Sequence, residues 1–406
     1  MQQDTYGQLI TSLALKNDKR IVMLVMDGLG DCANPQRGGT ALQLACTPNM
    51  DALAGRSACG LLVPVANAVT PGSGPGHLGL FGYDPLQYIV GRGVLSALGL
   101  EFPLQASDVA ARLNFCTLDK AGNVADRRAG RIPDEENRRV LAKIRKGLKV
   151  PAGVEVFFET EAEHRALMVL RGAGLDDNIG ETDPQTTGVP ALKANRAPHD
   201  KSATANIVAN IIDQVGKILA DEPKANMILA RGFAKYPTWP KFPDRYKLNP
   251  AAVAGYPMYR GVARLVGIPV VSQPTTAIDV CTEAGKAMQD HTFVFAHFKY
   301  TDKTGEDGDL DGKIQRIEEM DAALPTLLAA NPDVLIITGD HSTPPSLKAH
   351  SWHPIPVLMH APHIRGGQSA HFDEINCRGG EIGTIPSKEI LPLAMAHAGK
   401  LEKYGA

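Results

Sequence analysis

The chain has 406 residues, 44% of them hydrophobic, and a formal net charge of -2 at pH 7. This near-neutral balance excludes the basic excess that is typical of dedicated nucleic-acid or membrane-surface binders, and no apolar run reaches the roughly 18 residues of a membrane span. The length favours two domains.

The first 20 residues and the cysteines predict a cytoplasmic location. The N-terminal segment lacks the basic stretch followed by an apolar stretch that a signal peptide needs. The six cysteines are scattered and form no CxxC pair. This distribution is typical of reduced thiols and argues against a disulfide framework or a zinc knuckle. We therefore expect a cytoplasmic protein without nucleic-acid or membrane partners.

Three short apolar runs, each followed by an acidic residue, predict strands of a parallel sheet, because such strands are apolar on both faces. They are Ile21–Met26 before Asp27, Thr292–Phe298 before Asp302, and Val334–Thr338 before Asp340. Helical segments lie between them, such as Asn49–Leu53 after a Thr-Pro start and Lys313–Leu328. The alternation predicts an α/β fold with a doubly wound, mostly parallel sheet. The three acidic ends should meet at one edge of that sheet, where ligands bind.

Residues 96–268 have a different texture and predict a second, smaller α+β domain. This region contains an Arg-rich stretch at 126–131 and a charged helical segment, Glu135–Lys149. Two predicted strands follow, Val154–Thr160 and Ala166–Leu170, and then a proline-rich loop, Phe233–Asp244. Because strands of matching chemistry lie on both sides, we expect this domain to be inserted into one formed by residues 1–95 and 269–406.

Ser73 lies in a stretch rich in glycine and proline, TPGSGPGH at residues 70–77. Flanking glycines allow a ligand to approach the backbone and leave the hydroxyl uncrowded. Such clusters are also ordinary turns. No predicted strand runs directly into Ser73, so the stretch does not match the nucleophile elbow of GxSxG hydrolases.

Carboxylates and imidazoles follow two of the predicted strands. Asp340 and His341 together suit a divalent cation, although an aspartate there could also cap the next helix. Asp302 and Glu306 share a face if their segment is helical, or belong to an acidic turn if it is not. His350 follows further along and is either a ligand or a surface or core histidine.

Taken together, these side chains indicate phosphoryl transfer with metal ions. Mixed carboxylates and imidazoles without cysteine suit Mn²⁺, Zn²⁺ or Mg²⁺ rather than a structural zinc site. A metal beside the Ser73 hydroxyl would lower its pKa and make it a nucleophile. A second metal would neutralise charge on the phosphoryl oxygens. The pattern therefore favours Ser73 as a nucleophile for phosphoryl transfer beside bound metal ions.

Longer strings of the sequence resemble a known family. In chain order these are VMLVMDGLGD, TPNMDALA, PGSGPGHLGLFGYDP, GRGVLSALG, ARLNFCTLD, DRRAGRI, ETDP and ITGDHSTP. They resemble the archaeal-type branch of the 2,3-bisphosphoglycerate-independent phosphoglycerate mutases, in family order over residues 21 to 400. The resemblance implies the alkaline phosphatase superfamily fold with an inserted substrate-holding domain. It also implies a glycolytic isomerase that needs two divalent metals, Mn²⁺ being the expected ion, and no bisphosphoglycerate.

The resemblance also implies roles for individual residues, listed here by role. Ser73 matches the phosphorylated serine; Asp27, Ser73, Asp340 and His341 match the ligands of one metal; Asp302 and His350 match ligands of the second. The family usually has a histidine four residues after this aspartate, where the chain has Glu306. Glu306 either replaces that imidazole with an oxygen ligand, which suits Mn²⁺ or Mg²⁺, or leaves the second site weaker.

The substrate implied by the resemblance is a small phosphorylated acid, 3-phosphoglycerate or 2-phosphoglycerate. Residues in matching segments would bind it: His77, Arg112, Asp126, Arg127, Arg131 and Arg231. Lys299, just before Asp302, could also reach the phosphate. The alternative for each arginine is a surface ion pair. Arginine forks hold carboxylate and phosphate groups in a bidentate manner. The alternatives are a related phosphotransferase or phosphatase with the same metal core, including a homoserine-kinase-like relative, and a non-catalytic protein of the same fold.

Overall fold

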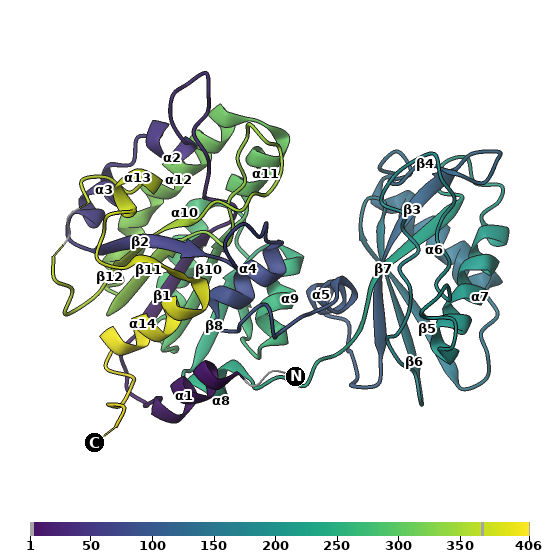
Figure 1. Cartoon of the computed structure of the whole chain (residues 1–406), viewed down its shortest axis with the longest axis horizontal. Helices are drawn as coiled ribbons and strands as arrows, with labels where there is room; N and C mark the ends of the chain where they lie inside the picture. The colour runs from purple at the N-terminus through teal and green to yellow at the C-terminus, as the bar shows by residue number, and fades with distance from the viewer. Residues whose placement is uncertain (1–3, 367–368, 406) are drawn as a thin grey trace. The chain divides into compact units, whose positions relative to one another are not determined.

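The computed structural model describes residues 4–366 and 369–405. The chain divides into two compact units. The first is discontinuous and consists of Met1–Ile89 and Trp239–Ala406, and the second consists of Val90–Thr238. Figure 1 shows the chain leaving the first unit after its early strands and returning to it for its later ones.

The first unit is built on a sheet whose described part has eight strands. Their order is β13 (Gly383–Pro386), β2 (Ala58–Val63), β12 (Ile355–His360), β11 (Val334–Thr338), β1 (Ile21–Met26), β10 (Phe293–Phe298), β8 (Pro250–Ala254) and β9 (Val270–Ser272). Only β12 runs antiparallel to its neighbours among these strands. The predicted α/β class with a mostly parallel sheet is confirmed.

The central strands are buried on both faces, as their unbroken apolar sequences require. Every residue of β1 and of β10 is buried. In the sheet, Met23 lies between Phe295 on one side and Ile336 on the other. The two predicted strands thus occupy the middle of the sheet, with the third, β11, beside them.

Helices cover both faces of this sheet (Figure 1). Their bounds are α1 Thr5–Leu13, α2 Ala41–Leu44, α3 Pro48–Ala54, α4 Ser73–Leu80, α8 Phe242–Tyr246, α9 Pro257–Leu265, α10 Ala277–Ala287, α11 Tyr300–Asp307, α12 Leu310–Ala329, α13 Glu374–Cys377 and α14 Ile390–His397. Helices α2, α3, α10 and α12 share one core with the side chains of Val22, Leu24 and Met26. Helix α4 packs on the opposite face, where Phe81 meets Phe295 with ring centroids 4.9 Å apart.

The second unit is an antiparallel sheet with helices, as expected for an α+β domain. Its described strands are β3 Val109–Leu118, β4 Val124–Asp126, β5 Val154–Ala162, β6 Arg165–Gly172 and β7 Met227–Lys235, and its helices are α5 Arg92–Gly99, α6 Asp134–Gly147 and α7 Ala203–Ile218. Apolar residues of α6 and α7 form one core with β3 and β6.

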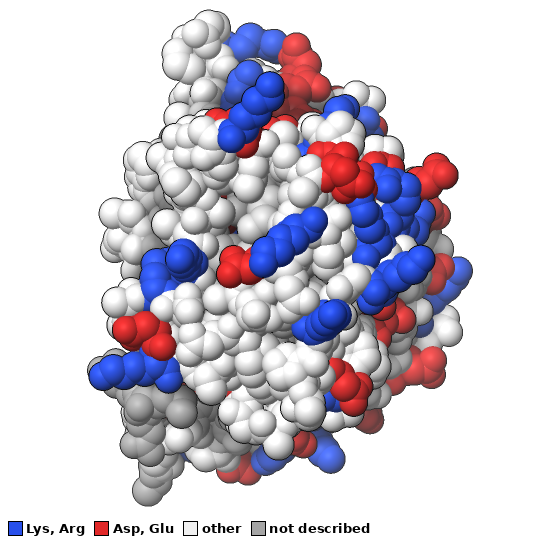
Figure 2. Space-filling model, turned by 90° about the vertical axis from the view of Figure 1, so that its right-hand side faces the viewer, with Lys and Arg blue, Asp and Glu red and all other residues white. Residues whose placement is uncertain are grey.

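Positive and negative side chains lie next to one another on the face shown in Figure 2. Ion pairs of this kind join α6 to the residues that follow α7: Lys143 Nζ lies 2.8 Å from Glu222 Oε1. Within α6, Arg139 also pairs with Glu136 at 2.6 Å. Pairs of opposite charge give such a surface no strong field of one sign.

The boundaries of the second unit differ from the predicted 96–268. Residues 239–268 belong to the first unit, because β8 pairs with β10 in the large sheet. The proline-rich tract Phe233–Asp244 is also not one loop, since β7 extends to Lys235 and α8 begins at Phe242. The predicted boundary was wrong because it rested on local composition, whereas β8 pairs with β10, a strand some 40 residues later in the chain.

Across residues 4–366 and 369–405, no helix is both long enough and apolar enough to cross a membrane.

The carboxyl group of Glu374 predicts a pH-dependent stability. Its Oε2 accepts a hydrogen bond of 2.7 Å from Thr40 Oγ1, whereas its buried Oε1 has no hydrogen-bond partner among the described residues. Burial raises the pKa of Glu374 to about 7. Because the pKa of Glu374 is higher in the folded protein, the unfolded chain loses this proton at a lower pH. The free energy of unfolding therefore falls as the pH rises from the ordinary pKa of a glutamate to about 7.

We therefore expect the unfolding free energy of the wild type to fall relative to Glu374→Gln between pH 5 and pH 8, by up to about 3 kcal/mol. Urea unfolding at both pH values measures this difference. Replacing the exposed Glu402 by glutamine serves as the control. A difference between wild type and Glu374→Gln that stays constant with pH would contradict the prediction.

Candidate active site

The order of the strands brings three acidic residues to one edge of the large sheet. Strand β1 lies between β11 and β10, and all three run in the same direction. Asp27 follows β1, Asp302 lies in α11 just after β10, and Asp340 follows β11. The start of the antiparallel β12 lies at the same edge, so His350 also reaches it. The three acidic residues that follow the apolar runs therefore meet at one edge of the sheet, as the sequence predicted.

A sharp turn after β1 positions Asp27. Gly28 has a φ of +62°, and a Cβ atom on it would lie 2.5 Å from Thr343 Oγ1 and 2.8 Å from the Cβ of Asp302. Glycine is therefore required both for the left-handed backbone and for the close approach of neighbouring segments. The turn also lets the Gly28 N–H donate to Asp340 Oδ1 at 3.1 Å.

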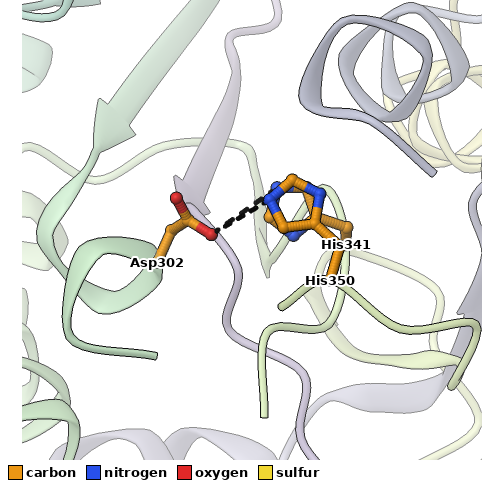
Figure 3. A group of neighbouring side chains, drawn as sticks. All are labelled: Asp302, His341 and His350. Atoms are coloured by element: carbon orange, nitrogen blue, oxygen red, sulfur yellow. Dashed lines mark ion pairs between the residues drawn. The ribbon is translucent and has the colours of Figure 1, made fainter. Parts of the chain in front are cut away.

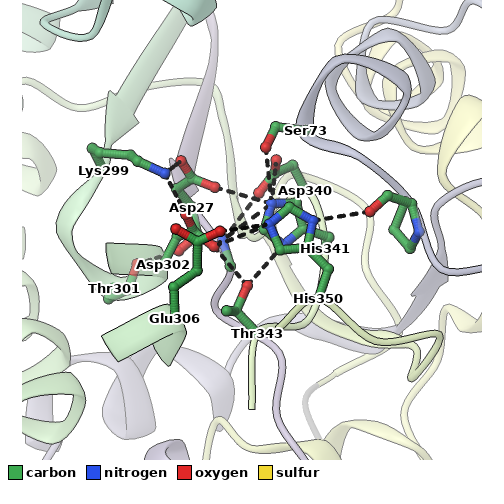
Figure 4. Close-up of polar contacts among 12 residues, drawn as sticks. Asp27, Ser73, Lys299, Thr301, Asp302, Glu306, Asp340, His341, Thr343 and His350 are labelled. Atoms are coloured by element: carbon green, nitrogen blue, oxygen red, sulfur yellow. Dashed lines mark hydrogen bonds and ion pairs between the residues drawn. The ribbon is translucent and has the colours of Figure 1, made fainter. Parts of the chain in front are cut away.

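Ser73 is the first residue of α4 and is buried. Its Oγ lies 3.2 Å from Nε2 of His341 (Figure 4). Helix α4 packs closely against the strand end that carries Asp340: a Cβ on Gly76 would lie 2.4 Å from the Asp340 carbonyl oxygen. The glycine-rich stretch is thus a helix start that must approach the backbone, not a plain turn.

Two groups of three side chains could each hold a metal ion, and His341 belongs to both. The ligand atoms of Asp27, Asp340 and His341 lie within 4.8 Å of one another, as do those of Asp302, His341 and His350. His341 Nε2 is 3.3 Å from Asp27 Oδ1 and 3.3 Å from Asp340 Oδ2. In the second group, His350 Nε2 is 3.4 Å from Asp302 Oδ1 (Figure 3).

Glu306 lies at the rim of the second group. It is one turn of α11 after Asp302, as the spacing of four residues predicts for a helix. Its Oε1 is 3.8 Å from His350 Nε2, and its side chain is 55% exposed. The nearby His353 turns elsewhere, with its Nδ1 2.9 Å from Ser351 Oγ and its ring stacked on Trp352.

The electrostatics of the site favour a bound cation. Burial raises the pKa of Asp27, but the charges of Lys299 and His341 outweigh it and hold that pKa well below its ordinary value. Asp302 has a pKa lowered to about 2, because contacts with His350 and Lys299 outweigh burial and the charge of Asp27. Burial lowers the pKa of His350, yet its bond to Asp302 raises it to about 9. The acidic groups therefore stay ionised and attract positive charge.

Several buried carboxylate oxygens of the site have no hydrogen-bond donor, and they indicate whether a metal ion fits here. Among the described residues, Asp27 Oδ1, Asp27 Oδ2 and Asp340 Oδ2 accept no hydrogen bond, although the Lys299 ammonium lies near Asp27 Oδ2 and His77 Nδ1 lies near Asp340 Oδ2. Such buried carboxylate oxygens are costly unless a cation meets them. Oxygen donors with two imidazoles are also a ligand set that divalent first-row metals accept. The residues present therefore fit divalent metal ions.

Two predicted substrate residues have partners within the site. The Lys299 ammonium lies 3.0 Å from Asp27 Oδ2 and also contacts Asp302 Oδ2, so it bridges two carboxylates. His77 is fully buried behind Ser73: its Nδ1 is 2.8 Å from the Ser73 carbonyl oxygen and 3.1 Å from Asp340 Oδ2.

The remaining predicted substrate residues lie in the second unit, mostly paired with acids. Arg127 donates to both carboxylate oxygens of Asp183, at 2.9 and 2.7 Å. Arg231 Nη1 lies 3.4 Å from the same carboxylate. Arg112 pairs with Glu161 at 3.3 Å.

The other two predicted residues of this unit belong to one turn. Asp126 accepts backbone hydrogen bonds from residues 128 and 130, at 2.8 and 2.6 Å. It therefore shapes the turn of the Arg-rich stretch. Arg131 ends that turn with a φ of +52° and is exposed.

Sequence reasoning missed several residues that the fold brings in. Thr343 contacts both Asp302 and His341. His297 is buried beside Asp27, with its Nε2 3.7 Å from Asp27 Oδ2 and its ring stacked on Tyr259. Its position inside the apolar run of β10 was the only available signal. Asp183 lies in the ETDP string, which carried part of the family resemblance but gave no role for this aspartate.

Comparisons with known proteins show the family to which this chain is similar. A family model described as 2,3-bisphosphoglycerate-independent phosphoglycerate mutase matches residues 54–225. A protein from Thermus thermophilus named as a probable enzyme of this kind is 48% identical, over 98% of this chain and 99% of its own length. One from Thermotoga maritima with the same name is 46% identical over 98% of this chain and 99% of its own.

Solved structures show the same fold. A protein from Pyrococcus horikoshii has a TM-score of 0.81 and 29% identity, and the match covers 96% of this chain and 99% of that one. The cofactor-independent phosphoglycerate mutase from Thermoplasma acidophilum has a TM-score of 0.70 and 28% identity, with 94% and 100% covered.

Proposed function

Because the chain belongs to the family of 2,3-bisphosphoglycerate-independent phosphoglycerate mutases, we propose that it interconverts 3-phosphoglycerate and 2-phosphoglycerate through a phosphoserine at Ser73. The observation that carries this proposal is the contact of Ser73 Oγ with His341 Nε2, at 3.2 Å, within a buried acidic group. The phosphoryl group would move from one hydroxyl of glycerate to Ser73, and then from Ser73 to the other hydroxyl.

The position of Ser73 supports its role as acceptor. As the first residue of α4, it lies where backbone N–H groups are free of helical partners and the helix dipole is positive. A phosphate at this position is stabilised by both effects. In the transfer, a bond forms between Ser73 Oγ and phosphorus as the bond from phosphorus to the substrate oxygen breaks. The proton lost by the serine is balanced by the one that the leaving oxygen gains.

We assign the two metal groups to two divalent ions. Asp27, Asp340 and His341 would hold one ion together with Ser73. Asp302 and His350 would hold the other, with Glu306 as a further oxygen ligand at the rim. When bound, such ions lower the pKa of a serine hydroxyl and neutralise phosphoryl oxygens. The excess of carboxylates makes Mn²⁺ the expected ion, with Zn²⁺ and Mg²⁺ as alternatives.

Residues around the nucleophile would hold the serine and the charges in place. His77 would fix the start of α4 through the Ser73 carbonyl, rather than touch the phosphate, because its ring is fully buried. Lys299 would let Asp27 and Asp302 lie close together by offsetting their negative charges. These roles leave substrate recognition to the arginines of the second unit.

Arg112, Arg127, Arg131 and Arg231 are the proposed ligands of the anionic substrate, and Asp183 would orient two of them. Replacing Arg127 by alanine should raise KM by about ten- to hundredfold, since one charge-assisted hydrogen-bond donor is worth about 1.5–3 kcal/mol. Steady-state kinetics measures the change. Arg139→Ala removes an arginine of α6 that pairs with Glu136 and with Glu222, and it should leave KM unchanged.

Asp183→Asn should raise KM in the same direction as Arg127→Ala, because Arg127 would lose its bidentate partner. If Arg127→Ala has wild-type kinetics, Arg127 does not bind substrate. If Arg139→Ala raises KM as much, the effect reflects general loss of charge in this unit.

The function is tested by turnover of 3-phosphoglycerate with Mn²⁺ and without bisphosphoglycerate. We expect 2-phosphoglycerate to form without release of inorganic phosphate. Release of phosphate without 2-phosphoglycerate would instead show a phosphatase. Intact mass after brief exposure to substrate should show the addition of one phosphoryl group.

A further inference from the structure

A buried threonine joins the two groups of acidic and imidazole side chains. Thr343 lies two residues after His341 and is fully buried. Its Oγ1 is 2.7 Å from Asp302 Oδ1 and 3.0 Å from His341 Nδ1 (Figure 4). Asp302 belongs only to the second group, whereas His341 belongs to both. One hydroxyl therefore contacts the two groups at once.

The chemistry of the three partners decides which way each hydrogen bond runs. An ionised carboxylate only accepts, so the Thr343 hydroxyl gives its one hydrogen to Asp302. Its oxygen is then left as an acceptor for His341, and the proton of that imidazole lies on Nδ1. Whenever the His341 ring is neutral, its lone pair therefore lies on Nε2, which faces Asp27, Asp340 and Ser73.

His350 shows the same arrangement with a different partner. Its Nδ1 lies 3.0 Å from the Pro71 carbonyl oxygen, which can only accept, so this nitrogen carries the proton. Its Nε2 therefore faces Asp302 with a free lone pair whenever the ring is neutral. Both imidazoles are held by Nδ1 and present Nε2 inward, as metal-binding histidines are when an outer partner fixes the tautomer.

Thr343 is itself held firmly between two loops. Its N–H donates to the Gly30 carbonyl oxygen at 2.9 Å. The fully buried Lys313 of α12 donates from Nζ to the carbonyl oxygens of both Gly30 and Thr343, each at 3.0 Å. The ammonium thus ties the turn after β1 to the turn after β11. The hydroxyl has little freedom to leave its two partners.

We propose that Thr343 is a positioning residue that fixes the tautomer and orientation of His341 and couples the two cation-binding groups. This inference rests on the proposed function, because it treats these groups as metal ligands. A carboxylate and an imidazole joined by one hydroxyl move together, so that ordering one group orders the other.

The test compares three variants of the full chain. Thr343→Val keeps the shape but removes the hydroxyl, and Thr343→Ser keeps the hydroxyl. Thr304→Val is the matched control: its hydroxyl lies on α11, as Asp302 does, but bonds only to the carbonyl oxygens of Tyr300 and Thr301. Calorimetric titration of metal-stripped protein with Mn²⁺ gives the affinities. The histidine ring ¹⁵N spectrum of the metal-free protein, recorded at a pH high enough to keep the ring neutral, gives the tautomer of His341.

We expect Thr343→Val to weaken Mn²⁺ binding by about ten- to hundredfold, the usual effect of losing an outer partner of a metal ligand. Its His341 should also lose the preference for a proton on Nδ1. Thr343→Ser and Thr304→Val should resemble the wild type in both measurements. If Thr343→Val proves unfolded, Thr343→Ala is measured in its place.

Wild-type Mn²⁺ affinity together with an unchanged His341 tautomer in Thr343→Val would overturn the inference. Failure of the wild type to bind Mn²⁺ would instead refute the proposed metal groups. In that event the spectrum of the metal-free protein still decides whether Thr343 fixes His341.

Discussion

Replacing Ser73 by alanine is expected to abolish the mutase reaction, with turnover falling by roughly 10⁴-fold or more. The reason is that the hydroxyl is the proposed acceptor of the phosphoryl group, and no other step can proceed without that bond. Turnover of 3-phosphoglycerate measures the loss. Intact mass should show no phosphoryl group on the variant under conditions that label the wild type.

A second serine provides a matched control for this experiment. Ser57 Oγ lies 3.2 Å from His360 Nδ1, so it forms the same kind of pair as Ser73 with His341. Ser57 precedes β2, however, and lies at the opposite edge of the sheet. Ser57→Ala should keep wild-type turnover. A phosphorylated Ser73→Ala protein would show that another residue is the acceptor.

Replacing His341 by alanine is expected to have the next largest effect, at least about 10³-fold on turnover. His341 is the only described side chain in both metal groups, so its loss should weaken both ions. His350→Ala removes a ligand of one group and should leave the other site intact. Titration of metal-stripped protein with Mn²⁺ should therefore show two tight ions for the wild type and one for His350→Ala. His341→Ala should lose the first ion and bind the second more weakly.

Two further variants show whether the loss of metal binding is specific to the proposed ligands. His353→Ala removes a neighbouring imidazole that bonds to Ser351 and stacks on Trp352, and it should bind both ions normally. Glu306→Gln should weaken only the second ion, by less than His350→Ala does, because Glu306 is half exposed at the rim. Equal loss of binding in His341→Ala and His350→Ala would contradict the larger effect expected for His341.

The family relationship supports the activity on which these predictions rest. Relatives covering nearly the full chain are named as probable phosphoglycerate mutases, and the match extends into the second unit. The chain departs from the family pattern at Glu306, which stands where the family usually has a histidine. Glu306 Oε1 lies 3.8 Å from His350 Nε2, at the rim of the group proposed to hold the second ion.

Some of the site follows from sequence because local patterns control it. A run such as Ile21–Met26 is apolar at every position, which only a doubly covered strand requires, and parallel strands place their carboxyl ends together. Asp27, Asp302 and Asp340 could be assigned to one edge without knowing which strands are neighbours. The spacing of Asp302 and Glu306 likewise needs only the helical repeat.

Other features depend on contacts between segments far apart in the chain, and only the folded structure decides them. Thr343 becomes a link between Asp302 and His341 because the turns after β1 and β11 meet, which no local pattern encodes. Residues 239–268 join the large sheet because β8 finds β10, so the boundary lies at 238 rather than 268. The types of residues and their spacing in the sequence specify the strands and the acidic residues at their ends. The partners of buried polar groups depend instead on how distant segments pack across the whole unit.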